Sequence, residues 1–179
     1  MRLVATPLAG AFVLELERRE DERGHFARTF DAELFAEHGL DARVAQCNLS
    51  VNERAGTLRG MHFQVAPHAE AKLVRVVRGA AWDVIVDLRP GSDTFCGWFG
   101  IELTADNDRA LFVPADVAHG FQTLADDTEM LYQMSTAFVP GSGGGVRWDD
   151  PAFGVDWPAA PSGGRVMSAR DAGYPDFVA

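Results

Sequence analysis

The sequence predicts an all-β fold, an antiparallel sandwich or barrel with few and short helices. Apolar and polar residues alternate with a period of two over Phe12–Leu16 and Trp82–Leu88, as in strands with two distinct faces. Elsewhere short apolar runs are separated by turn residues, for example at Arg89–Ser92 and Ala125–Asp127. Many short strands with one early helix are typical of antiparallel sandwiches and barrels.

The individual elements follow from the same patterns. Further strands are predicted at Arg43–Asn52, Thr57–Gln64, Lys72–Arg78, Phe95–Thr104, Ala110–Val113, Gly120–Leu124 and Glu129–Ser135. One helix is predicted between Asp31, which can cap its first amides, and Gly39, which favours a left-handed stop. The first residues predict a strand and not a signal peptide, and the Gly-rich stretch 141–145 predicts a loop. We expect residues 1–179 to form one domain, with the segment from about 141 to 179 packed over the barrel.

Composition excludes several classes of function. The formal net charge of −10 disfavours nucleic-acid binding, although a few arginines in a cleft can still attract a small anion. No apolar run approaches the roughly 20 residues of a membrane helix, so no membrane partner is expected. Cys47 and Cys96 form no CxxC motif, which predicts free thiols and a cytoplasmic protein.

Arg59 and His62 lie on one predicted strand, beside Gly60. Their odd spacing would place them on opposite faces of a regular strand. A bulge at Gly60 would instead turn both side chains inward. Spacing alone leaves open whether these residues form a site or are a surface arginine and a structural histidine.

Other candidate residues interrupt apolar strands. Lys72 and Asp83 either face solvent or pair in a lined cavity, where Lys72 could stabilise an oxyanion. Tyr132 faces inward, because methionines flank it at even spacing, and is either a structural tyrosine or a general acid. His119 could begin a strand or contact a ligand.

Metal and nucleotide-cofactor chemistry are poorly supported. His62 and His119 are too few ligands for a metal site, and the residue two after His62 is Gln64 and not a second histidine. No GxSxG, P-loop or GxGxxG motif occurs in a fitting context. We therefore expect chemistry without a metal or cofactor.

A series of motifs, in order over nearly the whole chain, resembles the dTDP-4-dehydrorhamnose 3,5-epimerase family of cupin-like jelly rolls. The matching segments are Asp21–Phe26, Gln46–Ser50, Gly56–Gln64, Lys72–Ser92, Val113–Leu124, Val146–Pro158 and Ser168–Asp171. The resemblance implies a cupin-type antiparallel jelly-roll barrel and a metal-independent isomerase acting on a dTDP-linked 4-keto-6-deoxy sugar. It also implies a homodimer with exchanged strands.

The resemblance implies a role for each matched position. His62 would be the base, Asp171 its orienting carboxylate, Tyr132 the opposing acid, and Lys72 a cation near the sugar ketone. The implied substrate-binding residues are Arg23, Phe26, Gln46, Asn48, Arg59, Asp83, His119, Phe138 and Arg170. Arg59 and Arg23 would hold the pyrophosphate, with Arg23 reaching from the partner subunit.

The sequence departs from the family pattern at Arg28, Phe138 and Gly143. These changes surround the nucleotide and the mouth of the cavity, so they affect substrate choice more than reaction type. The expected function is epimerisation at C3 and C5 of dTDP-4-keto-6-deoxyglucose. A single-carbon epimerase of this or another nucleotide sugar and a non-catalytic nucleotide-sugar binding protein are the alternatives.

Overall fold

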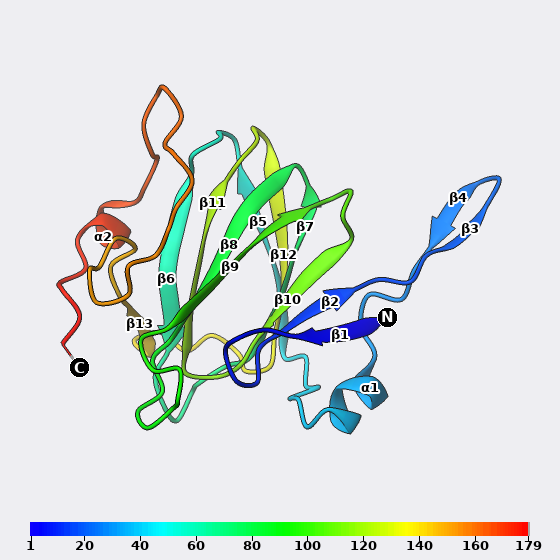
Figure 1. Ribbon diagram of the computed structural model, residues 1–179, viewed down its shortest axis with the longest axis horizontal. Helices are drawn as coiled ribbons and strands as arrows, with labels where there is room; N and C mark the ends of the chain where they lie inside the picture. Colours follow the sequence, from blue (N-terminus) through cyan, green and yellow to red (C-terminus); the bar gives the residue numbers. More distant parts are fainter. Residues whose placement is uncertain (179) are drawn as a thin grey trace.

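The computed structural model describes residues 1–178, which form an antiparallel jelly roll of two packed sheets (Figure 1). One sheet has six strands in the order β1 (Arg2–Ala5), β2 (Phe12–Glu15), β10 (Arg109–Val113), β7 (Lys72–Arg78), β12 (Thr128–Met134) and β5 (Gln46–Asn52). The other has five, in the order β13 (Gly143–Gly145), β6 (Leu58–Gln64), β11 (Val117–Thr123), β8 (Ala80–Asp87) and β9 (Trp98–Thr104). A separate hairpin pairs β3 (Arg19–Asp21) with β4 (Gly24–Phe26). The all-β jelly roll expected from the sequence is confirmed.

The period of two decides which side chains enter the space between the sheets. On β7 it places Lys72 on the same face as Val74 and Val76, which belong to the buried core. On β8 it places Asp83 on the same face as Ile85. The inner faces are therefore apolar along part of each strand and polar along the rest, so a polar region adjoins the core.

The predicted helix is confirmed as α1 (Ala32–Glu37). The Asp31 carboxylate accepts the amides of Glu33 and Leu34, and Gly39 has the left-handed φ of +68° that ends the helix. Phe35 is buried among side chains on the outer face of the six-stranded sheet.

Several boundaries differ from the sequence prediction. The loop expected at 141–145 is wrong, because Gly143–Gly145 pairs with β6 as β13. Backbone hydrogen bonds suffice for this pairing, and glycine lets the ring of Phe63 lie against Gly144. β9 begins at Trp98 and not at Phe95, since Cys96 has a positive φ of 63° that breaks the strand.

The C-terminal segment covers the outer face of the five-stranded sheet. Val146 and Phe153 are buried against Val84 and Val86, which point away from the space between the sheets. Near its end the segment forms a short helix, α2 (Ala169–Ala172), that the sequence patterns did not predict. No helix within residues 1–178 has the length and apolar character needed to cross a bilayer.

A bulge near Gly60 turns β6 toward the space between the sheets, which is one of the two alternatives that the spacing of Arg59 and His62 left open. His62 lies opposite His119 on β11, whereas Arg59 lies opposite Phe121, so three steps on β6 face two on β11. Gly60 has φ +125°, and a Cβ there would lie 2.5 Å from the Gly120 Cα. Only glycine fits this position, because the backbones of β6 and β11 meet there.

Replacing Gly60 by alanine is expected to destabilise the protein by at least about 2 kcal/mol, since the methyl group would strain φ and displace β11. Urea unfolding measures the change. Gly163→Ala is the matched control, because a Cβ there meets no atom within 4 Å, and its effect should stay within about 0.5 kcal/mol. Equal stability of the two variants would contradict the close-approach argument.

Candidate active site

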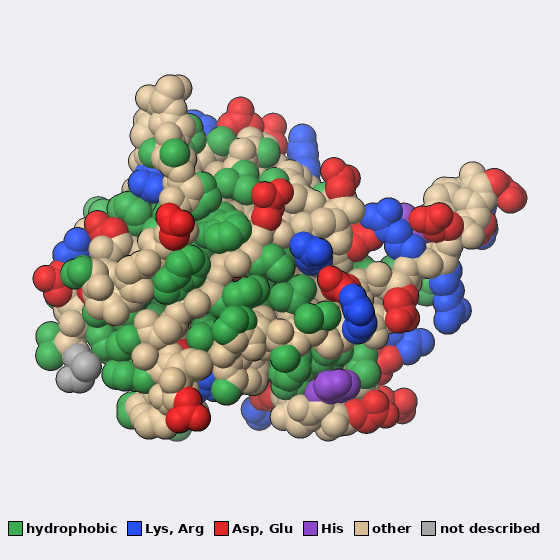
Figure 2. All heavy atoms as spheres, in the orientation of Figure 1, with side chains coloured by type: hydrophobic (Ala, Val, Ile, Leu, Met, Phe, Trp, Pro, Cys, Tyr) green, Lys and Arg blue, Asp and Glu red, His purple; other side chains and the backbone are tan. Residues whose placement is uncertain are grey.

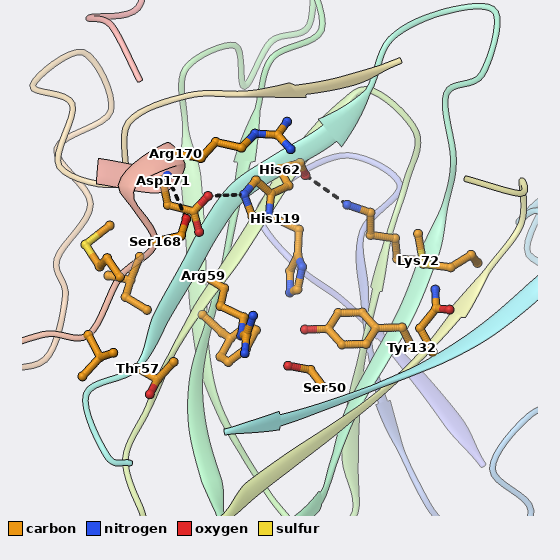
Figure 3. Close-up of a pocket in the computed structure, with 16 residues that line it drawn as sticks. Ser50, Thr57, Arg59, His62, Lys72, His119, Tyr132, Ser168, Arg170 and Asp171 are labelled. Atoms are coloured by element: carbon orange, nitrogen blue, oxygen red, sulfur yellow. Dashed lines mark hydrogen bonds and ion pairs between the residues drawn. The ribbon is translucent and has the colours of Figure 1, made fainter. Parts of the chain in front are cut away.

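A cavity of about 620 Å³ lies between the two sheets, with α2 at its rim (Figure 3). Eight of the residues singled out in the sequence line it: Asn48, Arg59, His62, Lys72, His119, Tyr132, Arg170 and Asp171. His62 comes from β6 and Tyr132 from β12, so they project from opposite sheets. A ring-shaped substrate in the cavity would therefore have an imidazole and a phenol on different sides.

His62 and Asp171 form the first polar pair. His62 Nε2 lies 2.7 Å from Asp171 Oδ1, and the other carboxylate oxygen accepts the Gly60 amide at 3.3 Å. Ser168 caps α2 by accepting the Asp171 amide at 3.1 Å, which fixes the carboxylate in place. Because Nε2–H donates to the carboxylate, the lone pair of the neutral ring lies on Nδ1.

Burial lowers the pKa of His62 below its ordinary value, and Asp171 opposes that shift by favouring the imidazolium. The positive charge of Lys72 and the nearby His119 lower it further. The imidazole is therefore neutral near pH 7 and able to accept a proton.

Lys72 is buried, with 6% of its surface exposed. Its ammonium donates to the His62 carbonyl oxygen at 3.0 Å and forms an ion pair with Glu70 Oε1 at 3.1 Å. An ammonium has three N–H donors, so one remains for a group in the cavity. Lys72 can therefore present a hydrogen bond and a positive charge to a substrate oxygen.

Tyr132 on β12 and His119 on β11 approach each other from the two sheets. Their rings meet edge to face, with centroids 5.9 Å apart. His119 Nε2 lies 2.8 Å from Asp83 Oδ1, and Asp83 is completely buried. Burial, with a smaller effect of the Asp83 charge, raises the pKa of Tyr132 above its ordinary value, so its hydroxyl stays protonated.

The remaining predicted residues lie outside the cavity lining. Asp83 is behind His119, and the Gln46 side chain accepts the Phe138 amide at 2.8 Å, with the Phe138 ring exposed. Arg23 and Phe26 lie on the β3–β4 hairpin, away from the cavity (Figure 1). Within one chain the structure does not bring these last two to the site.

Sequence reasoning missed several lining residues, among them Ser50, Thr57, Met134, Val166, Met167 and Ser168. Ser50 lies two residues after Asn48 on β5, so strand periodicity could have found it. Val166 reaches the cavity because its loop forms a bridge with Thr57, a contact for which the sequence has no periodic signal. Glu70, which pairs with Lys72, was also missed.

Residues 1–178 bring together no group of three or more His, Cys, Asp or Glu side chains arranged to hold a metal ion. His62 and His119 each use one ring nitrogen on a carboxylate. The polar groups of the site are thus arranged in pairs, a base with a carboxylate and a cation with a carboxylate. Such an arrangement suits proton transfer next to a stabilised oxyanion.

Comparison with known proteins agrees with this geometry. A sequence model of the family described as dTDP-4-dehydrorhamnose 3,5-epimerase matches residues 5–178. The dTDP-4-dehydrorhamnose 3,5-epimerase of Methanothermobacter thermautotrophicus is 42% identical over 170 residues, covering 95% of this chain and 91% of the relative. A dTDP-4-dehydrorhamnose 3-epimerase of Streptomyces niveus is 39% identical over 172 residues, 96% of this chain and 81% of the relative.

The crystal structure of dTDP-4-dehydrorhamnose 3,5-epimerase from Elizabethkingia anophelis superposes with a TM-score of 0.94 at 38% identity, over 99% of this chain and 96% of that one. The family resemblance inferred from the ordered motifs is confirmed by sequence and by structure. The chain belongs to the dTDP-4-dehydrorhamnose 3,5-epimerase family.

Proposed function

We propose that the protein is an isomerase that inverts C3 and C5 of dTDP-4-keto-6-deoxyglucose, for the synthesis of a dTDP-L-rhamnose-type sugar. The observation that carries the proposal is the placement of His62 and Tyr132 on opposite sheets across one cavity, with Lys72 beside them. The names of the relatives support the substrate and the reaction. A cytoplasmic location is part of the proposal, in keeping with the free thiols of Cys47 and Cys96.

The mechanism uses side chains of this chain alone. His62 Nδ1 removes the proton from a carbon next to the C4 ketone, and the electron pair moves to the ketone oxygen as an enolate. The free N–H of Lys72 stabilises this oxyanion. The Tyr132 hydroxyl then returns a proton to the other face of the same carbon, which inverts it.

Both reacting carbons flank the same ketone, so one base and one acid serve both when the ring is presented twice. After each turn His62 holds an extra proton and Tyr132 lacks one. Because burial raises the Tyr132 pKa, the phenolate is a strong base and takes a proton from solvent, and the His62 imidazolium releases its proton to solvent, before the next turnover.

The nucleotide end has its own cations. Arg59, whose Nε donates to Asn52 Oδ1 at 2.8 Å, and Arg170 both border the cavity and are exposed. Guanidinium groups suit pyrophosphate oxygens, and they make the mouth locally positive on a chain of net charge −10. The exposed Phe138 ring offers a stacking surface for a base, with Gln46 holding its backbone.

A second candidate is inversion at one carbon only. The 3-epimerase relative is nearly as similar as the 3,5-epimerase relative, at 39% against 42% identity. The same base and acid serve either reaction, so the departures at Arg28, Phe138 and Gly143 bear on this choice. A non-catalytic binding protein is disfavoured, because four groups with complementary chemical roles converge on the cavity: His62, Lys72, Tyr132 and Asp171.

Replacing His62 by alanine is expected to reduce deuterium wash-in from heavy water at both carbons by at least about 100-fold, because the base is lost. Binding of dTDP should change little. NMR of dTDP-4-keto-6-deoxyglucose incubated with wild type counts the labelled carbons. Two labelled carbons support inversion at both positions, and one labelled carbon supports the single-carbon reaction. No labelling by wild type would show a binding protein, and unchanged exchange in the variant would refute the base.

Tyr132→Phe is expected to impair inversion more than proton removal, because the variant keeps the ring and loses only the donor. We expect completed inversion to fall by about 100-fold or more, with a clearly smaller loss of wash-in. The same NMR assay gives both rates from one sample. Equal loss of the two rates would count against Tyr132 as the acid.

We also propose that the protein is a homodimer that exchanges its N-terminal strands. The β3–β4 hairpin stands away from the rest of the chain and carries Phe26, which is 72% exposed (Figure 2). Leu49 and Val51 on the outer face of the edge strand β5 are 55% and 54% exposed. An isolated hairpin of this kind is marginally stable alone, so a second copy of the chain is its natural support.

In such a dimer Arg23 acts in the partner's cavity. Arg23→Ala is then expected to raise KM by about tenfold or more, the effect of losing one charge-assisted hydrogen bond, with little change in kcat. Mixing Arg23→Ala with His62→Ala chains should restore a site with the wild-type KM. In each mixed dimer, one cavity has both His62 from its own chain and Arg23 from the other chain. Absence of complementation in mixed dimers, verified by sedimentation, would show that Arg23 does not act across subunits.

A further inference from the structure

Lys72 is the only lysine in the chain. The other side chains that carry a permanent positive charge are arginines. Arginine stays charged at any pH at which proteins fold, whereas the charge of a lysine depends on its surroundings. Lys72 is 6% exposed, and this burial lowers its pKa below the ordinary value. A neutral amine could not stabilise an enolate as an ammonium does, so something must oppose the effect of burial.

Glu70 is placed to do so. It precedes β7 and is itself 5% exposed, with Oε1 3.1 Å from the Lys72 ammonium. The other oxygen, Oε2, is buried and has no hydrogen-bond partner among residues 1–178. A buried carboxylate with so few partners is stabilised mainly by the adjacent cation. Glu70 does not line the cavity, so it acts on a substrate only through Lys72.

We propose that Glu70 is a positioning residue that keeps Lys72 protonated and directs its remaining N–H at the substrate's ketone oxygen. The inference rests on the proposed function. Glu70 Oε1 and the His62 carbonyl fix two of the three donors of Lys72, which leaves one direction for the third.

The other groups around Lys72 do not replace this contact. Asp83 on β8 also favours the ammonium, but its Oδ1 is bonded to His119 on β11 and no ion pair joins it to Lys72 in the described chain. On β6, His62 is paired with Asp171, and on β12 the Tyr132 hydroxyl is uncharged. Glu70 is thus the carboxylate in direct contact with the ammonium.

The test uses the single lysine. Uniform labelling with 15N-lysine gives one side-chain Nζ signal, so NMR reads the pKa of Lys72 without assignment. Glu70→Gln keeps the size and an acceptor but removes the charge, and Glu70→Asp keeps the charge. Glu102→Gln on the exposed face of β9 is the matched control for loss of one carboxylate.

We expect Lys72 to be protonated in wild type at the pH at which the protein is active, and its pKa to fall by at least about one unit in Glu70→Gln. Glu70→Asp should keep most of the wild-type value, and Glu102→Gln all of it. In the deuterium wash-in assay, the basic limb of the Glu70→Gln pH profile should move to lower pH by the same amount, because the active ammonium is lost earlier.

A neutral Lys72 amine in wild type at the pH of activity would overturn the proposal, whether or not the variants fold. An unchanged Lys72 pKa in Glu70→Gln, or an equal fall in Glu70→Asp, would also overturn it. Failure of the proposed function has a different signature: wild type would exchange no deuterium into the sugar, while the NMR titration would still report the effect of Glu70 on Lys72.

Discussion

The hydrogen bond between His62 and Asp171 joins the barrel to the end of the chain, and the organisation of the site depends on it. His62 belongs to β6, whereas Asp171 lies in α2, a helix of four residues that has few other contacts with the barrel. A helix this short is not stable by itself; Ser168 caps its first turn, and the Asp171 carboxylate holds it against β6. The C-terminal segment therefore contributes a carboxylate that contacts His62 as well as cover for the sheet.

The same region shows why the bulge at Gly60 is needed. In a regular strand Arg59 and His62 would point to opposite faces. The extra residue turns both toward the cavity, and the Gly60 amide is then free to donate to the Asp171 carboxylate. One local irregularity thus places Arg59 and His62 on the cavity and lets the Asp171 carboxylate contact both His62 and the Gly60 amide.

The elements with strong local signals could be predicted from the sequence. Asp31 and Gly39 define α1, and Gly60 suggested its bulge, because caps and positive φ depend on nearby residues. Alternation could place Tyr132 on an inner face, but not show that it lies across from His62, because that depends on how the sheets pack. The assignment of Asp171 to His62 came from family resemblance, since no spacing rule links residues 109 positions apart.

The elements that were missed lack such signals. β13 consists of glycines and has no side-chain pattern, and the β3–β4 hairpin is exposed and mostly polar, so no apolar alternation marks it. Glu70 belongs to a polar stretch before β7, where a carboxylate would ordinarily face solvent. Glu70 is buried because it pairs with the buried Lys72, and this contact depends on the tertiary structure.

Inversion of a carbon requires proton removal on one face and proton delivery on the other. Two facing sheets can place a base and an acid on opposite sides of a substrate. His62 and Tyr132 come from different sheets and line the same cavity of about 620 Å³. The groups need opposite protonation states, and their surroundings supply these: burial keeps the imidazole neutral and the phenol protonated at the same pH. Lys72 is the exception, because burial lowers its pKa and so disfavours its charged form. In the proposed mechanism low polarity prepares the base and the acid, so the ammonium needs a carboxylate beside it, and Glu70 lies in that position.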